Sequence, residues 1–297
     1  MSPWKSLGLG LLVATSAVAA LADDDYTRSV EAWRADRKDK LTKPDGWLTL
    51  TGLFWLRPGE NTVGAAPDNT IHLTSGPAHF GTVVLEPGNV ARFKPWPKES
   101  IMIDQAPAAP GVLRHGGGLK PSYVQSGTVT FYVIEHGTQL GLRVKDSEAP
   151  RRLKFAGIDY FPIDPAWRVE AKWVPFDSPR TINFADVLGQ TQTASVPGEA
   201  VVTLQGRTFA LLPIDEGKDR PLFFVIGDAT NGGESHGGGR FLYTEWPKDG
   251  KVTLDFNHLE NPPCAFSPFT ICPLPPKDNQ LPFPVPVGEK AYRGEGS

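Results

Sequence analysis

From Trp47 to Phe256, apolar residues stand in short runs that alternate with polar residues and end at glycine or proline. Examples are Trp47–Leu56, Thr128–Glu135 and Leu140–Lys145. A period of two is that of a strand, whose successive side chains point to opposite faces. The chain has 31 glycines and 29 prolines, which can supply a turn between each pair of runs. No helical stretch of ten residues separates the runs, so we expect antiparallel rather than parallel sheets.

The pattern predicts about sixteen strands, and a single sheet of that size would curl or split. We therefore expect a mainly β fold, a large antiparallel sandwich or barrel-like structure. One N-terminal helix is predicted over Asp25–Leu41, where Val30, Trp33 and Leu41 form a sparse apolar face. Leu254–Phe283 is rich in proline, and residues before proline favour extended backbone. This segment is expected to form an extended Cys/Pro-rich C-terminal strap.

The N-terminus has the pattern of a secretory signal peptide over residues 1–22. Lys5 precedes an apolar run, Leu7–Ala19, and two small-x-small sites follow at Ala17–Ala19 and Ala20–Ala22. The apolar run is shorter than the roughly 20 residues that span a bilayer. We expect a periplasmic or secreted protein with a single β-rich domain over 23–297. The prolines near 147–164 leave open a division into two β halves.

The charge balance bears on the partners of the protein. The net charge is −3 and no basic cluster is present, so nucleic acid is not an expected partner. We also expect no membrane insertion after removal of the signal peptide. The sequence assigns no cofactor and no catalytic residue.

Two glycine-rich motifs overlap between residues 233 and 239. GESHG at Gly233–Gly237 fits the nucleophile elbow of serine hydrolases, and HGGG at His236–Gly239 fits an oxyanion element. An elbow requires a helix after the serine, whereas Arg240–Thr244 has the pattern of a strand. We interpret the motif as a glycine-rich loop between strands.

Cys264 and Cys272 are the two cysteines of the chain. In an exported protein two cysteines usually pair, so a disulfide is the first expectation. Two unpaired thiols are the second. A metal site is the third, because Cys264, Cys272 and His258 could supply three ligands, with Asp255 or His236 as a fourth. No CxxC pair supports the metal.

Five polar residues follow or begin consecutive predicted strands. They are Asp228, Arg240, Asp255, Asn257 and Asn261. Neighbouring ends of antiparallel strands lie close together, and Arg240 could pair with either aspartate. We expect these residues to bind a ligand. The alternative is a network that only stabilises turns, since Asp and Asn cap backbone N–H groups in loops.

Several motifs resemble the family catalogued as domain of unknown function 1684. They are GWLTLTGLFWL at 46–56, GDATNG at 227–232, GRFL at 239–242, LDFN at 254–257, NPPCAF at 261–266, CPLPP at 272–276 and GEK at 288–290. The resemblance extends from about Trp33 to Lys290 and implies one domain. It implies no activity. Members without export signals make a purely structural disulfide less compelling. Ser235 and His236 depart from the family pattern, which makes a catalytic role of His236 doubtful.

The leading functional hypothesis is an exported β-protein that binds a small polar ligand or glycan at the five polar residues, beneath Cys264–Pro276. The first alternative is a hydrolase that uses Asp255 with Asp228 or Glu289 as acid and base, or a metal. The second is a structural protein without a catalytic site.

Overall fold

The computed structural model describes the backbone of residues 11–294 and the side chains of residues 23–294. The chain forms two compact units. Unit 1 contains the chain up to Asp39, Gly157–Ala265 and Ile271–Arg293, and unit 2 contains Lys40–Ala156, Phe266–Thr270 and the chain from Gly294. The boundary between residues 156 and 157 lies inside the stretch 147–164, where the sequence offers a break. The single domain over 23–297 stays a prediction.

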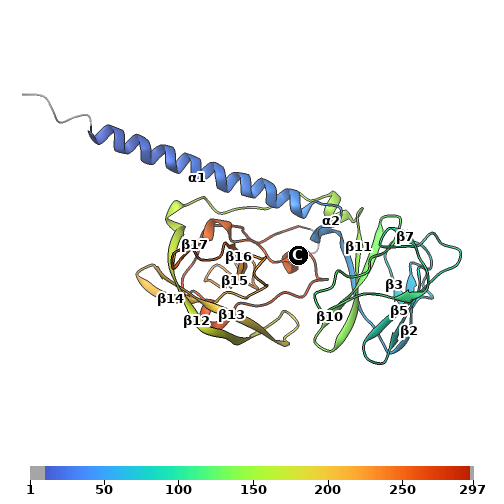
Figure 1. The fold of residues 1–297 in the computed structure, drawn as a ribbon. Coiled ribbons are helices and arrows are strands. Elements are labelled where there is room, and N and C mark those ends of the chain that lie inside the picture. Colours follow the sequence, from blue (N-terminus) through green and yellow to red (C-terminus); the bar gives the residue numbers. More distant parts are fainter. Residues whose placement is uncertain (1–10, 295–297) are drawn as a thin grey trace, which may run out of the picture. The chain divides into compact units, whose positions relative to one another are not determined.

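The expectation of a mainly β fold is confirmed, and unit 1 contains two of its sheets (Figure 1). The strands of the first sheet are β12 (Arg168–Ala185), β13 (Thr191–Leu204), β14 (Arg207–Leu211) and β17 (Lys251–Asp255). They pair antiparallel in the order β14-β13-β12-β17. A separate hairpin pairs β15 (Leu222–Ile226) with β16 (Arg240–Thr244). Phe224 and Leu242 of the hairpin share one core with Val202 and Leu254 of the sheet.

The hairpin β12–β13 is longer than the sequence predicts. The pattern indicates separate strands at Trp167–Val174 and Arg180–Asn183, but β12 continues through both, with an irregular register between Pro175 and Arg180. Residues 175–179 contain two prolines and are largely exposed, so the sequence pattern is interrupted there although the strand continues. Its end pairs with the strap, because Val187 N donates to Cys272 O (3.0 Å) and Leu274 N donates to Ala185 O (2.8 Å).

The predicted helix is present and begins earlier than expected. Helix α1 is Leu11–Leu41, so it includes the second half of the predicted signal peptide. Leucine and alanine favour helix, and neither glycine nor proline occurs between residues 11 and 41. Among the residues that the structure describes, no helix is long and apolar enough to cross a membrane. Residues 1–10 and the side chains up to 22, which carry much of the signal pattern, lie outside the described part.

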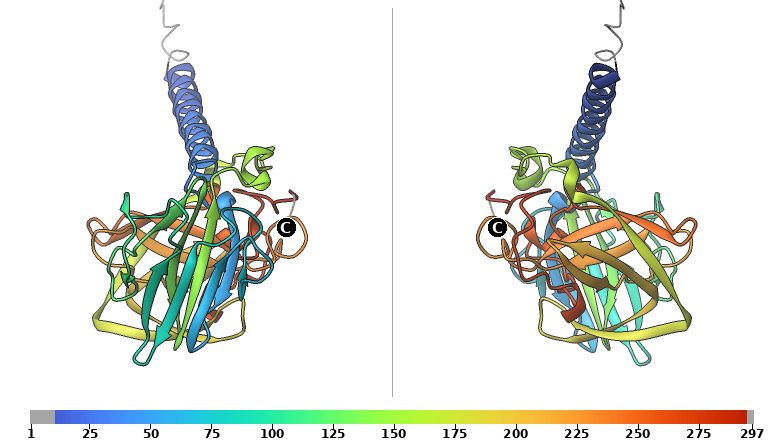
Figure 2. Two further views of the ribbon diagram at one scale, coloured as in Figure 1. Left: turned by 90° about the vertical axis from the view of Figure 1, so that its right-hand side faces the viewer. Right: turned by 90° about the vertical axis from the view of Figure 1, so that its left-hand side faces the viewer.

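Unit 2 has two sheets around one core, as in a sandwich (Figure 2). The first sheet has the order β1-β11-β10-β9-β6-β7. Its strands are β1 (Leu50–Trp55), β6 (Met102–Ile103), β7 (Ala106–Pro107), β9 (Val124–Ser126), β10 (Val129–His136) and β11 (Gln139–Asp146). The second has the order β3-β2-β4-β5-β8, and only its pair β2–β3 is parallel. Its strands are β2 (Gly59–Gly64), β3 (Ile71–His72), β4 (Gly81–Glu86), β5 (Val90–Pro95) and β8 (Gly111–Val112).

The alternation in the sequence accounts for the core of unit 2. Phe131 and Val133 of β10 are buried together with Val83 of β4 and Phe93 of β5, and the residues between them in each strand are more exposed. Phe131 meets both Phe80 and Phe93 edge to face, at 5.4 and 5.7 Å between ring centroids. Such contacts add to the burial of apolar area. Unit 2 also has the short helices η1 (Trp47–Thr49) and α2 (Pro150–Leu153).

The strap is extended, as expected, and contains three single turns of 3₁₀ helix. These are η3 (Phe256–His258), η4 (Pro263–Ala265) and η5 (Lys277–Asn279). Unit 1 has one more, η2 (Pro165–Trp167). Asparagine side chains satisfy backbone groups that no sheet pairs. Asn279 Nδ2 donates to Leu212 O (2.9 Å), and Leu212 N donates to Asn279 Oδ1 (2.8 Å).

Candidate functional site

Asp228 and Arg240 form a buried ion pair at the hairpin β15–β16. Arg240 starts β16 and Asp228 follows β15, so the register of the hairpin brings them together. Arg240 Nη2 donates to Asp228 Oδ2 at 2.8 Å, and both side chains are fully buried. Arg240 also donates to the carbonyls of Val285, Val287 and Glu289. Burial lowers the pKa of Arg240, and Asp228 opposes that shift.

The second oxygen of Asp228 is also fully used. Asp228 Oδ1 accepts from Thr230 N (2.8 Å), Thr230 Oγ1 (2.6 Å) and Val285 N (3.1 Å). A buried charge is tolerated when its hydrogen-bonding capacity is met in this way. The pair thus fixes the loop after β15 to the last residues of unit 1.

Asn261 belongs to a second buried cluster with Glu289 and Arg37 of α1. Glu289 accepts from Arg37 Nε (2.9 Å) and from Asn261 N (2.6 Å), and its side chain is fully buried. Arg37 Nη2 donates to Asn261 O at 2.8 Å. Burial raises the pKa of Glu289, against the opposite effect of Arg37. Arg240 Nη1 reaches Glu289 O at 3.2 Å, so the two clusters form one network.

Asp255 and Asn257 lie at the end of β17. Asp255 Oδ1 accepts from Tyr26 Oη (2.8 Å) and from Asn257 N (3.1 Å). Asn257 exchanges two hydrogen bonds of 2.9 Å with the backbone of Asp164. Burial and the bond to Asp255 raise the pKa of Tyr26. Arg168 Nε lies 3.8 Å from Asp255 Oδ2, and Arg168 remains more than half exposed.

All five predicted residues are buried and contact protein groups. Asp228, Arg240 and Asn261 join the one network, whereas Asp255 and Asn257 bind Tyr26 and Asp164. Their role as ligand-binding residues stays a prediction. Asp255 is connected to an open surface through Arg168, which lines a groove.

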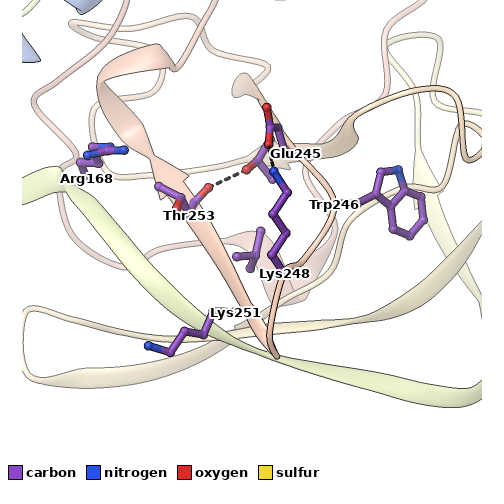
Figure 3. A pocket seen from close by; sticks show the side chains of 8 residues that line it. Arg168, Glu245, Trp246, Lys248, Lys251 and Thr253 are labelled. Atoms are coloured by element: carbon purple, nitrogen blue, oxygen red, sulfur yellow. Dashed lines mark hydrogen bonds and ion pairs between the residues drawn. The ribbon is translucent and has the colours of Figure 1, made fainter.

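This groove has a volume of about 320 Å³ and lies in unit 1 (Figure 3). Its lining residues come from the start of β12, the end of β16, the β16–β17 connection and the start of β17: Arg168, Thr244, Glu245, Trp246, Lys248, Lys251, Val252 and Thr253. Thr244 Oγ1 donates to Thr253 O at 2.6 Å and joins two of the walls. Asp249 and Gly250 reverse the chain with positive φ of 52° and 70°, as a tight two-residue turn requires.

The groove combines cationic side chains with one half-buried aromatic ring. Arg168, Lys248 and Lys251 line it together with a single carboxylate, Glu245. Trp246 packs against the core of unit 1, and its Nε1 donates to Arg220 O at 2.8 Å, which fixes the ring. Figure 3 shows Arg168 and Trp246 at opposite ends, with Lys248 between them. This arrangement offers a flat apolar surface and hydrogen-bond donors to a polar or anionic ligand.

Two exposed ion pairs occur at the groove. Lys248 Nζ lies 2.9 Å from Glu245 Oε2, and Lys251 Nζ lies 2.6 Å from Glu170 Oε1. The hydrogen bond from Lys248 lowers the pKa of Glu245. Because water surrounds these pairs, either lysine can exchange its partner for a ligand at little cost.

None of the residues that line this groove is among the site residues that the sequence predicts. The one local signal is a tryptophan among charged residues in the turn Glu245–Lys248, where a purely structural turn does not require an aromatic ring. Arg168 is more than 70 residues away in sequence, and only the pairing of β12 with β17 brings it there.

Neither cysteine forms a disulfide in the structure. The two residues are nevertheless adjacent, because Cys264 N donates to Cys272 Sγ at 3.2 Å. The disulfide of the exported protein stays a prediction. The metal trio with His258 is not formed, since His258 stacks on Trp33 at 4.7 Å between ring centroids. Across the described residues, no group of three or more His, Cys, Asp or Glu side chains could hold a metal ion.

The GESHG motif forms a loop, and β16 follows it as the sequence indicates. Ser235 is buried, and its Oγ lies 2.6 Å from Thr230 Oγ1 and accepts from Asn231 Nδ2 (2.9 Å). The following residue, His236, has its Nε2 3.5 Å from Cys264 Sγ. The serine therefore has a structural environment, without the strand-to-helix turn of a nucleophile elbow.

Fold and groove define a mainly β protein with an open surface groove lined by Arg168, Lys248 and Lys251. The family model described as protein of unknown function (DUF1684) matches residues 153–290, and over these residues the chain belongs to that family. The match includes the NPPCAF and CPLPP motifs, whereas GWLTLTGLFWL at 46–56 lies outside it. The resemblance inferred from the sequence is thus confirmed for the second half of the chain.

No curated protein matches the chain. Among solved structures, it is similar to the solution NMR structure of an uncharacterized protein of Haloarcula marismortui. The two sequences are 33% identical over 47% of this chain and 78% of the other, with a TM-score of 0.40.

Proposed function

We propose that the protein is exported and binds a small polar ligand or glycan in the groove between Arg168 and Trp246. The observation that carries the proposal is a fixed, half-buried tryptophan at a groove with three cationic side chains and one carboxylate. An aromatic face packs against the C–H face of a sugar ring, and arginine donates to carboxylate or phosphate oxygens. The ligand favoured by this lining therefore carries negative charge, as an acidic sugar does.

The buried residues beside the groove help to position Arg168. Asp255 accepts from Tyr26 and lies beside Arg168, so it limits the positions that the guanidinium can take. The predicted residue Asp255 then acts through Arg168 and does not touch the ligand. The hydrolase alternative needs Asp255 with Asp228 or Glu289 at a substrate. All three carboxylates are engaged by protein donors, so no contact favours that alternative.

The test is a titration with a panel of neutral and acidic monosaccharides, followed by calorimetry. We expect glucuronate to bind more tightly than glucose. Trp246→Ala should weaken binding about fivefold, since an aromatic contact contributes about 1 kcal/mol. Arg168→Gln should remove the preference for the acidic sugar. The matched controls are Trp96→Ala and Lys98→Ala, because both residues are exposed and lie in unit 2.

The proposal fails if no member of the panel binds, or if Trp246→Ala and Trp96→Ala behave alike.

Export is tested separately, by expression of the full chain and recovery of the protein from the periplasm or the medium. N-terminal sequencing of secreted or periplasmic protein should begin after Ala19 or Ala22. An intact Met1 in protein that stays inside the cell contradicts export.

A further inference from the structure

A second cluster of reactive side chains in unit 1 is separate from the groove and contains Cys264, Cys272 and His236. They come from three segments: η4, the strap after it, and the loop before β16. Cys264 N donates to Cys272 Sγ at 3.2 Å. His236 Nε2 lies 3.5 Å from Cys264 Sγ. Two thiols and one imidazole are thus in contact.

The two thiols differ in their access to solvent. Cys272 is 3% exposed and packs with Phe223, Val225 and Phe241. Cys264 is only partly buried at the edge of the same cluster. In thiol–disulfide exchange, an accessible thiol attacks first and an inaccessible neighbour resolves the intermediate. The exposures assign the first role to Cys264 and the second to Cys272.

His236 is placed to accept the proton of Cys264, because its Nε2 lies 3.5 Å from Cys264 Sγ. Burial keeps the imidazole neutral by lowering the pKa of His236, so one ring nitrogen is free of a proton. The bond to Cys272 and burial raise the pKa of Cys264, so the thiol is protonated at rest and loses its proton only during exchange. Gly238 leaves room for the ring, because a Cβ there would lie 3.1 Å from His236 Nε2. Tyr243 is a further titratable group near Cys272, and burial raises its pKa.

Cys272 is held in place by the β12–β13 hairpin. Its carbonyl accepts from Val187 N, and Leu274 N donates to Ala185 O. The short segment η4 carries Cys264 and is tied by its own backbone N–H to the sulfur of Cys272. A backbone N–H donor at sulfur stabilises the negative charge that develops on Cys272 during exchange. The two cysteines are therefore adjacent before any disulfide forms.

We propose that Cys264 and Cys272 form a thiol–disulfide exchange site for a low-molecular-weight disulfide, with His236 as the base. Cys264 gives its proton to His236, and its sulfur bonds to one sulfur of the substrate while the substrate S–S bond breaks. The leaving sulfur takes this proton back from His236 and departs as a thiol. Cys272 then attacks Cys264 Sγ, the mixed disulfide breaks, and the proton of Cys272 passes to the second leaving sulfur, which departs as a thiol. The protein dithiol is oxidised by two electrons, and one disulfide is reduced to two thiols.

Glutathione disulfide is the probe for the test, and the reduced full-length protein is followed by mass spectrometry. The wild type should form an internal disulfide and release two equivalents of glutathione. Cys272→Ser should stop at a mixed disulfide on Cys264. Cys264→Ser should react at least about tenfold more slowly, because its remaining thiol is buried. These outcomes show that Cys264 is the attacking thiol and Cys272 the resolving thiol.

The role of His236 is tested by its pH dependence. His236→Gln should react at least about tenfold more slowly at pH 7, and the difference should vanish at alkaline pH, where hydroxide removes the proton. The matched control is His72→Gln, an exposed histidine of unit 2. If His236→Gln is slower than the wild type by the same factor at every pH, His236 is not the base. If the wild type does not react with glutathione disulfide, or if both cysteine variants react equally, the exchange site is excluded. The ligand groove is unaffected by either result.

Discussion

Two ion pairs of unit 1 have almost the same length and opposite surroundings. Arg240 and Asp228 are 2.8 Å apart with both side chains fully buried, whereas Lys248 and Glu245 are 2.9 Å apart with side chains 81% and 84% exposed. The buried pair has lost its water and depends on protein partners, so it holds the loop after β15 in one position. The exposed pair keeps its water and can exchange partners. The distance between two charges therefore does not distinguish a structural ion pair from one at a binding site. The burial of the pair does distinguish them.

The largest effect is expected when one partner of the buried pair is removed. Asp228→Ala leaves Arg240 charged and buried and should cost about 3–5 kcal/mol of unfolding free energy. Because the chain has two units, a single unfolding midpoint does not isolate this loss. Hydrogen exchange of the β15 and β16 amides measures it locally.

The control for this experiment is Glu86→Ala in unit 2. It removes an ion pair of the same length, 2.8 Å, that is exposed to solvent. If Asp228→Ala does not fold, Asp228→Asn is the second variant, because its amide oxygen still accepts from Thr230 and Val285 while Arg240 loses its counter-charge. If the β15 and β16 amides exchange equally slowly in Asp228→Ala and Glu86→Ala, the buried pair does not stabilise this hairpin.

An intermediate effect is expected at Glu289, with a defined pH dependence. Burial raises the pKa of Glu289 above its ordinary value near 4.5. Between the ordinary and the raised pKa the folded state binds more protons than the unfolded state, so stability falls as pH rises through this window. The slope contributed by one such group is at most about 1.4 kcal/mol per pH unit. Glu289→Gln should remove this contribution.

The measurement is denaturant unfolding of wild type and Glu289→Gln from pH 4 upwards, with exchange of the β16 amides as the local probe. The difference between the two proteins should shrink on the acidic side, where Glu289 is protonated and resembles glutamine. A stability difference between the two proteins that is the same at every pH would contradict the raised pKa. The exposed Glu245→Gln is the control, and its curve should follow that of the wild type.

Part of this comparison could be predicted from the sequence. Arg240 was expected to pair with either Asp228 or Asp255, because all three follow or begin strands; the register of one hairpin, β15–β16, selects Asp228. The mainly β fold follows from local alternation, as in Val129–His136. The extended strap follows from its prolines. These features depend on residues close together in the sequence.

The remainder depends on contacts between distant segments. Arg37 meets Glu289 across 252 positions, and Tyr26 meets Asp255 across 229, so no local pattern marks either contact. The groove has the same origin, since Arg168 reaches it only through the pairing of β12 with β17. The sequence divides β12 into two strands because two prolines and exposed residues interrupt the alternation at 175–179. The periodicity of apolar residues in the sequence indicates which residues are buried. It therefore does not reveal an exposed surface site.

The smallest effect on stability is expected at the exposed pair. Lys248→Ala should leave the melting temperature and the hydrogen exchange of unit 1 unchanged, since solvent already screens both charges. The same substitution should weaken the binding of glucuronate and reduce the salt dependence of that binding, because one cation leaves the groove. Asp228→Ala should show the opposite behaviour, with lost stability and no direct change in the groove. If Lys248→Ala destabilises unit 1 while ligand binding persists, the exposed pair belongs to the scaffold, and burial would no longer distinguish the two regions.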